Sequence, residues 1–207
     1  MSTDSSLSRR KVLLVGTATT VATVLAGPSL ALAANAKGSA GDVAILSAAY
    51  DLESQGIWAY GAAGGKLSDT PVGKMVLALA KRNQSDHERH RVALGNALSS
   101  LGANPPAPKK EYDLSTYIEA GEGGLGSDGD IARLALALEI DAALAYQGAF
   151  AQLKNAQLRT SALSIMPDEV GHAVAIRAAL GGLMKGVEAV PSPFLAADTR
   201  KDWVLKP

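Results

Sequence analysis

The chain has 207 residues, of which 47% are hydrophobic and only 4% aromatic, and equal numbers of basic and acidic residues give it a formal net charge of zero. This length accommodates one substantial core, and abundant Ala and Leu beside few aromatic residues favour closely packed helices, so we predict a single all-α domain. The absence of cysteine excludes disulfides, thiolate zinc sites and cysteine nucleophiles, and the lack of a basic run interleaved with aromatic residues argues against nucleic acid as a partner.

The N-terminus has the layout of a secretory signal peptide. The paired Arg9 and Arg10 precede a moderately apolar stretch that ends in the small-residue motif Ala31-Leu32-Ala33. We therefore assign residues 1–33 to a signal peptide and predict a periplasmic or otherwise exported protein. The arginine pair resembles a twin-arginine export signal, and an ordinary secretory signal is the alternative. Threonines interrupt the apolar stretch, which is also short for a membrane span, so we predict no span in the mature chain.

Four segments of the mature chain space their apolar residues as a helix does. They run from about residue 40 to 63, 71 to 101, 128 to 155 and 160 to 184. The third is apolar on almost all sides, which is typical of a helix deep in a core. In the fourth, Pro167 either begins the helix at that point or kinks it.

The connection between the second and third helices is long and rich in Pro and Gly. We interpret residues 102–127 as a crossover with a helical turn near residues 114–119. Short connections on either side of a long one are the plan of a four-helix bundle made of two helical hairpins, which we place at residues 34–190. Residues 191–207 are predicted to be an irregular C-terminal tail, packed on the surface or used in a contact.

Each predicted helix carries ionisable residues on its apolar face. Burying such groups costs several kcal/mol unless they are paired, so their position needs a chemical reason. The set includes all three histidines of the chain. Its members are Glu53 in the first helix, His87 and His90 in the second, Glu139 in the third, and Glu169 and His172 in the fourth.

A hairpin repeat is visible in two of these helices. Glu53 is followed seven residues later by Tyr60, and Glu139 seven residues later by Tyr146. We expect each tyrosine to lie just outside the cluster, with its hydroxyl bonded to a neighbouring acid, in preference to a redox role.

In this combination the sequence resembles the ferritin-like superfamily, in which one Glu from each of two helices and a Glu-x-x-His from each of the others bind two metal ions. The resemblance covers roughly residues 42 to 185, and the overall layout is most similar to exported bacterial ferritin-like proteins grouped with desiccation-related proteins. It implies a dinuclear iron or manganese centre in the bundle core. The implied ligands are Glu53, His90, Glu139, Glu169 and His172, with His87 at the sixth position.

His87 is the departure from the family pattern, because it stands where the first hairpin should supply a bridging glutamate. A neutral imidazole cannot bridge through two oxygens, and one negative charge is lost. The alternatives left open are two metals held asymmetrically, a single metal, a different metal, or none. Asp86 lies next to this position and is a candidate to replace the glutamate after a small rotation, whereas Glu88 is expected to be exposed.

The resemblance implies oxidation of ferrous iron or removal of peroxide in stress protection. The sequence assigns no catalytic residue and does not decide whether the protein is an enzyme. The alternative is a metal-free structural or stress-related scaffold that binds a partner, with the crossover or the tail as the contact. Whether the chain assembles as a homo-oligomer is also left open.

Overall fold

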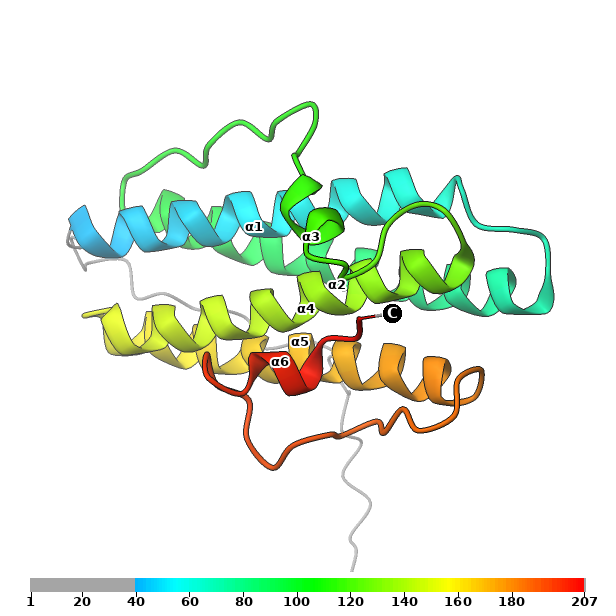
Figure 1. The fold of residues 1–207 in the computed structure, drawn as a ribbon. Coiled ribbons are helices and arrows are strands. Elements are labelled where there is room, and N and C mark those ends of the chain that lie inside the picture. The colour runs from blue at the N-terminus through cyan, green and yellow to red at the C-terminus, as the bar shows by residue number, and fades with distance from the viewer. Residues whose placement is uncertain (1–39, 207) are drawn as a thin grey trace, which may run out of the picture.

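Four long helices form a bundle of two hairpins. The computed structural model describes residues 40–206, which contain six helices and no strand. The first hairpin consists of α1 (Ala40–Gly64) and α2 (Pro71–Ser100), and the second of α4 (Asp128–Gln152) and α5 (Ala156–Gly181). Figure 1 shows the four helices side by side along one axis. The predicted all-α bundle is confirmed, while the predicted signal peptide lies outside the described residues.

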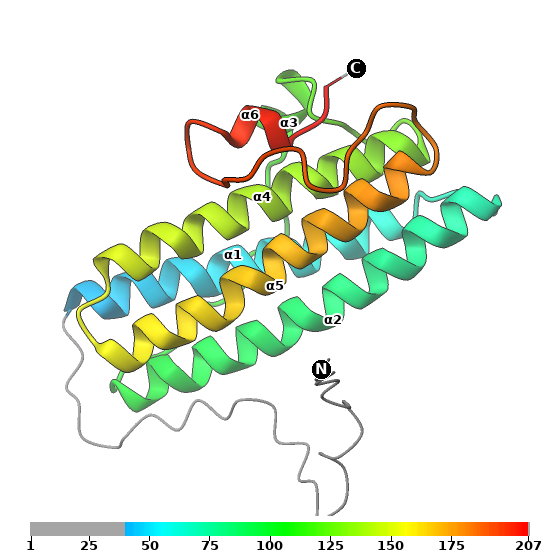
Figure 2. The ribbon, with the colours of Figure 1, turned by 90° about the horizontal axis from the view of Figure 1, so that it is seen from below.

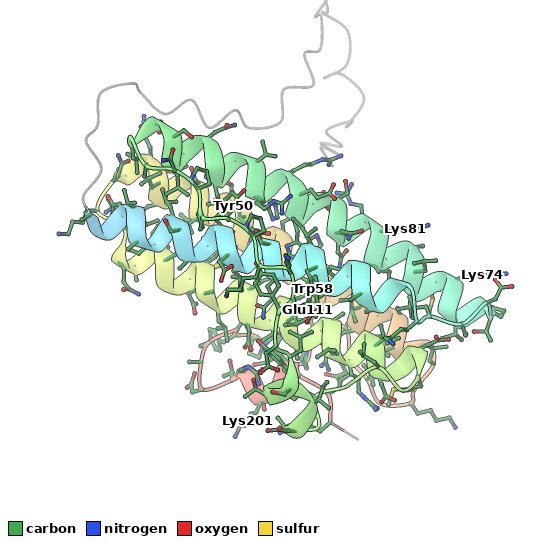
Figure 3. The ribbon with its side chains drawn as sticks, turned by 90° about the horizontal axis from the view of Figure 1, so that it is seen from above. Tyr50, Trp58, Lys74, Lys81, Glu111 and Lys201 are labelled. Carbon is green, nitrogen blue, oxygen red and sulfur yellow. The ribbon has the colours of Figure 1, made fainter. Side chains whose placement is uncertain are left out.

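The crossover joins the two hairpins along the outside of α1. The chain leaves α2, runs back over α1 and forms α3 (Ser115–Glu119) before it reaches α4 (Figure 1). Asp51 of α1 fixes this path, because it accepts hydrogen bonds from Lys109 Nζ at 2.8 Å and from the Tyr112 hydroxyl at 2.9 Å. Figure 3 shows Trp58 of α1 beneath the same stretch of crossover.

The ends of α4 and α5 differ from the prediction. Asn155 caps α5 by accepting hydrogen bonds from the backbone N–H groups at residues 157 and 158, and Asp42 of α1 accepts from those at residues 154 and 155. Helix α5 therefore begins at Ala156, about one turn before the predicted residue 160, and it runs on through Pro167. Helix α4 ends at Gln152 instead of residue 155, because Leu153 is already extended.

The C-terminal tail is more ordered than predicted. It contains a short helix, α6 (Arg200–Trp203), and Trp203 is buried in the core. Arg177 of α5, itself buried, donates to the backbone carbonyls of Glu188 and Trp203. These bonds hold the tail against the second hairpin, where α6 contacts α4 (Figure 2).

The core is divided into two apolar clusters. One, at the end of the bundle near α6, includes Leu136, Ile140 and Leu180, and the other, at the opposite end, includes Leu46, Leu98 and Leu158. Most of the predicted ionisable residues lie between the two clusters along their helices, and Glu139 lies next to Ile140 of the first cluster. Among the described residues, α4 is the one helix long and apolar enough to cross a membrane by length and composition, and it packs here as a core helix of the bundle.

Candidate metal centre

Two buried glutamates face each other across α1 and α4. Glu53 and Glu139 each have 1% of their surface exposed. The Tyr146 hydroxyl of α4 donates to Glu53, and the Tyr60 hydroxyl of α1 donates to Glu139. The two helices run antiparallel, so the repeated seven-residue spacing places each tyrosine opposite the other helix's glutamate. Each tyrosine thus takes the position expected from the repeat.

The remaining predicted side chains enter from α2 and α5. His90 Nδ1 lies 3.1 Å from Glu169 Oε1 and 3.6 Å from Glu53 Oε2. On the other side, His172 Nδ1 lies 3.2 Å from Glu139 Oε2 and 3.5 Å from Glu169 Oε2. Glu169, which is fully buried, therefore stands between the two imidazoles with one oxygen toward each.

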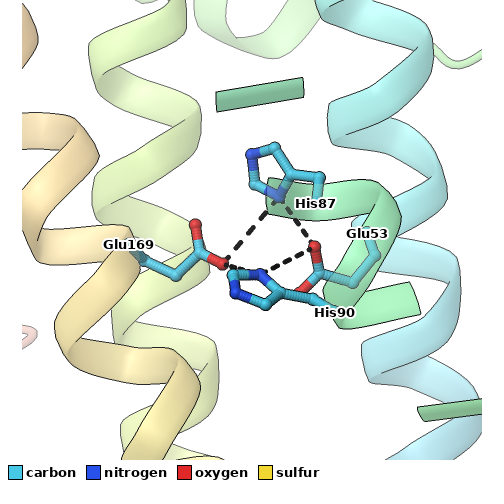
Figure 4. Close-up of side chains that lie close together, drawn as sticks. All are labelled: Glu53, His87, His90 and Glu169. Atoms are coloured by element: carbon cyan, nitrogen blue, oxygen red, sulfur yellow. Dashed lines mark hydrogen bonds and ion pairs between the residues drawn. The ribbon is translucent and has the colours of Figure 1, made fainter. Parts of the chain in front are cut away.

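The six predicted side chains form two overlapping groups of potential metal ligands. One group contains Glu53, His87, His90 and Glu169, and Figure 4 shows these four side chains converging from α1, α2 and α5. The other group contains His87, Glu139, Glu169 and His172. Within each group one donor atom per residue lies within 4.8 Å of the others. The two groups share His87 and Glu169, and each is a group that could hold a metal ion.

His87 occupies the space between the glutamates of α1 and α4. Its Nδ1 lies 2.7 Å from Glu53 Oε2, and its Nε2 lies 3.3 Å from Glu139 Oε1. Gly56 of α1 makes room for the ring, since a Cβ added at this position would lie 3.2 Å from two of its atoms. The imidazole thus lies between Glu53 and Glu139, where the family pattern would place a fourth glutamate.

Two aspartates contact the outer nitrogens of the other histidines. His90 Nε2 lies 3.1 Å from Asp168 Oδ2, and His172 Nε2 lies 3.4 Å from Asp86 Oδ2. Each aspartate thus contacts a histidine of the other hairpin. In metal sites, a carboxylate in this position orients the imidazole ligand. Asp86 is also held by Arg82 at 2.8 Å. It does not take the place of the missing bridging glutamate, contrary to the rotation considered from the sequence.

Asp168 was missed in the sequence, although a signal was present. It precedes His172 by four residues, as Asp86 precedes His90, so both hairpins repeat the same Asp-to-His spacing. Glu88, by contrast, is exposed as expected.

Comparison with known proteins decides the family. A model of the ferritin-like domain matches residues 41–182, which is more than half of the chain. The chain belongs to the ferritin-like family. A conserved hypothetical protein from Mycobacterium tuberculosis, known from its crystal structure, is 26% identical to this ferritin-like chain with a TM-score of 0.56, over 66% of this chain and 94% of that one. No protein of curated function matches significantly.

The acids of the ferritin-like bundle are balanced by its histidines. Burial acts to lower the pKa of each imidazole, but the neighbouring glutamates outweigh it and raise the pKa of His87 to about 12, of His90 to about 9 and of His172 to about 10. Burial likewise acts to raise the pKa of Glu53 and Glu139, yet contacts with these histidines hold both values below the ordinary range. All three imidazoles are therefore protonated on both nitrogens and positively charged at neutral pH when no metal is bound.

Glu169 is the least satisfied member of the cluster. Burial raises its pKa above the ordinary value. Within residues 40–206, neither of its carboxylate oxygens has a hydrogen-bond partner of good geometry, and neither does His90 Nδ1. A buried acceptor without a donor costs about 1–3 kcal/mol. A cation in either group, between Glu169 and the Nδ1 atom of His90 or of His172, would give these atoms a partner. The residues present therefore fit a metal of the kind that carboxylates and imidazoles bind.

Proposed function

We propose that this ferritin-like protein binds iron or manganese in the bundle core and uses the metal for oxidoreduction of ferrous iron or of peroxide in stress protection. Two adjacent ions fit the two overlapping ligand groups, and a single ion held mainly by Glu169 fits as well. Bound metal would supply Lewis acidity and a change of oxidation state. The chain's own residues would hold it, with Glu53, Glu139 and Glu169 setting the charge and the outer aspartates orienting His90 and His172.

The observation that carries this proposal is the position of Glu169. A carboxylate with no exposed surface and no good hydrogen bond, placed between two imidazole nitrogens, is expensive in a metal-free protein. The position becomes favourable once a cation lies between this carboxylate and either imidazole. The chemistry of the donors, oxygen and nitrogen without sulfur, suits iron and manganese.

One observation favours the alternative of a metal-free scaffold. Every histidine of the cluster lies within 3.3 Å of at least one acidic oxygen, so three imidazolium ions can balance three glutamates without a metal. In that case the cluster only stabilises the bundle, and a partner would bind elsewhere on the chain. The two functions differ in metal content and in the response of the fold to chelation.

Elemental analysis of the protein isolated from its own compartment tests the proposal. We expect between one and two iron or manganese ions per chain in the unmodified protein and a large loss in Glu169→Gln, which keeps the shape of the side chain but removes its charge. Glu88→Gln is the matched control, because Glu88 is a carboxylate on α2 that points to solvent. A metal content near zero in the unmodified protein, with no uptake of added ferrous or manganous ion, would support the scaffold instead.

We also propose that the protein is exported through the twin-arginine pathway. The support is the Arg9–Arg10 pair before an apolar stretch in the sequence. This route carries folded proteins, so the metal would be loaded before export. Replacing both arginines with lysine should keep the protein in the cytoplasm, as fractionation of cells would show, whereas unchanged export would indicate an ordinary secretory signal.

A further inference from the structure

An apolar cavity lies beside the metal centre, between the two hairpins. Its volume is about 80 Å³. Helices α1 and α4 supply most of its walls, and α2, α5 and the crossover supply the rest. His87 and Glu139 are among its lining residues, so the cavity opens directly onto the cluster.

The cavity exists because both of its main walls carry small side chains. Small residues line it on both helices, among them Gly56 and Ala59 of α1 and Ala132 and Ala135 of α4. Folded interiors are normally packed with few voids larger than a water molecule. The hairpins are tightly packed within themselves, and the seam between α1 and α4 is the looser contact. A single longer side chain from either helix would therefore reduce the space.

The walls select an apolar occupant. A buried water needs about two to four polar partners, and cavities without them stay dry; an apolar cavity of roughly 150 Å³ binds benzene or xenon. Apart from the groups that adjoin the cluster, the lining is dominated by Ala, Leu, Ile and Val. At about 80 Å³ it suits a molecule of a few heavy atoms and is too small for a long acyl chain.

We propose that this cavity binds a small apolar molecule and that its occupant is dioxygen, held next to Glu139 and His87. The identity of the occupant rests on the proposed function, because an oxidant is needed only if the centre holds a redox metal. Hydrogen peroxide forms strong hydrogen bonds with water, so the loss of its hydration disfavours it in such a space. Dioxygen has little hydration to lose. The apolar walls thus favour dioxygen over hydrogen peroxide as the oxidant of ferrous iron in this protein.

The binding site is tested by diffusion of xenon into crystals of the protein, with and without bound metal. We expect xenon between α1 and α4 in the unmodified protein, its loss in Ala135→Leu, and its retention in Ala145→Leu. Ala135 lines the cavity, whereas Ala145 lies on the exposed side of the same helix. Absence of xenon from the unmodified protein overturns the proposal without reference to any variant, and it leaves metal binding untouched.

The identity of the occupant is tested with ferrous-loaded protein and two oxidants. We expect Ala135→Leu to slow oxidation by dioxygen several-fold and to leave oxidation by hydrogen peroxide unchanged, with Ala145→Leu matching the unmodified protein for both. Equal slowing with both oxidants, or with neither, would overturn dioxygen as the occupant. Failure of the protein to take up metal would remove the proposed function and dioxygen with it, while the xenon result would still decide whether the cavity binds apolar molecules.

Discussion

Metal binding should release protons, because the three imidazoles are charged in the metal-free protein. The pKa values of His90 and His172 are about 9 and 10, and a metal ion binds only neutral imidazole. Two ions bound through these residues should therefore release about two protons per chain at pH 7, and about three if His87 also binds. Raising the pH removes the competing protons, so the combined affinity of the two ions should rise about a hundredfold per pH unit below pH 9 and about tenfold between pH 9 and 10. It should level off above about pH 10, where His172 is also neutral.

The proton count can be measured by isothermal titration calorimetry of the metal-free protein in buffers that differ in ionisation enthalpy. His90→Gln is the control and should release one proton fewer than the unmodified protein. Normal metal uptake without proton release at pH 7 would refute the reasoning, since it would mean that the histidines are neutral beside their glutamates.

Three further predictions concern stability. A pKa of His90 raised from 6.5 to about 9 favours the metal-free fold below pH 6.5 by roughly 3 kcal/mol, and this contribution should be lost as the pH rises through 9, as urea unfolding at pH 6 and 9.5 would show. A change from Gly to Ala within a helix ordinarily stabilises it by about 1 kcal/mol, but the Cβ of Gly56→Ala would crowd His87, so we expect a lower melting temperature. Gly171→Ala is the control and should raise the melting temperature, because its Cβ meets nothing within 4 Å. Arg177→Met leaves two carbonyls without their donor and should cost roughly 3 kcal/mol and speed proteolysis of the tail.

The sequence predicted the bundle and six members of the cluster because a helix fixes the face of each residue. Glu53 and Glu139 lie on apolar stripes, where a charge is costly to bury, so their position indicated a shared polar site. The same logic located His172 one turn from Glu169. These inferences need only the helical period and the cost of desolvation, and both are local properties of the chain.

The contacts between helices could not be predicted in the same way. The Asp168 side chain is 44% exposed, so it was not a charge on a buried face and did not stand out in the sequence. Its contact with His90 depends on how α5 packs against α2. The direction of Asp86 depends on Arg82 and on the opposite hairpin. The buried position of Trp203 depends on Arg177, a residue distant in sequence. The apolar cavity likewise arises only when the alanines of two helices meet.

We expect His87 to limit how many ions the centre holds. Two divalent ions carry one more positive charge than the three buried glutamates can balance, and such an excess is costly where water is largely excluded.

His87→Glu would supply the missing charge at the point where the imidazole now spans Glu53 and Glu139. It should raise the metal content to about two ions per chain if the present content is lower, and tighten the weaker ion if it is already two. In the metal-free state four buried glutamates would face two histidines, so the variant should be less stable than the unmodified protein until metal is added. Equilibrium dialysis with manganous ion and thermal melting measure both effects. A variant that binds no more metal than the unmodified protein, while folding normally, would show that charge does not limit the site.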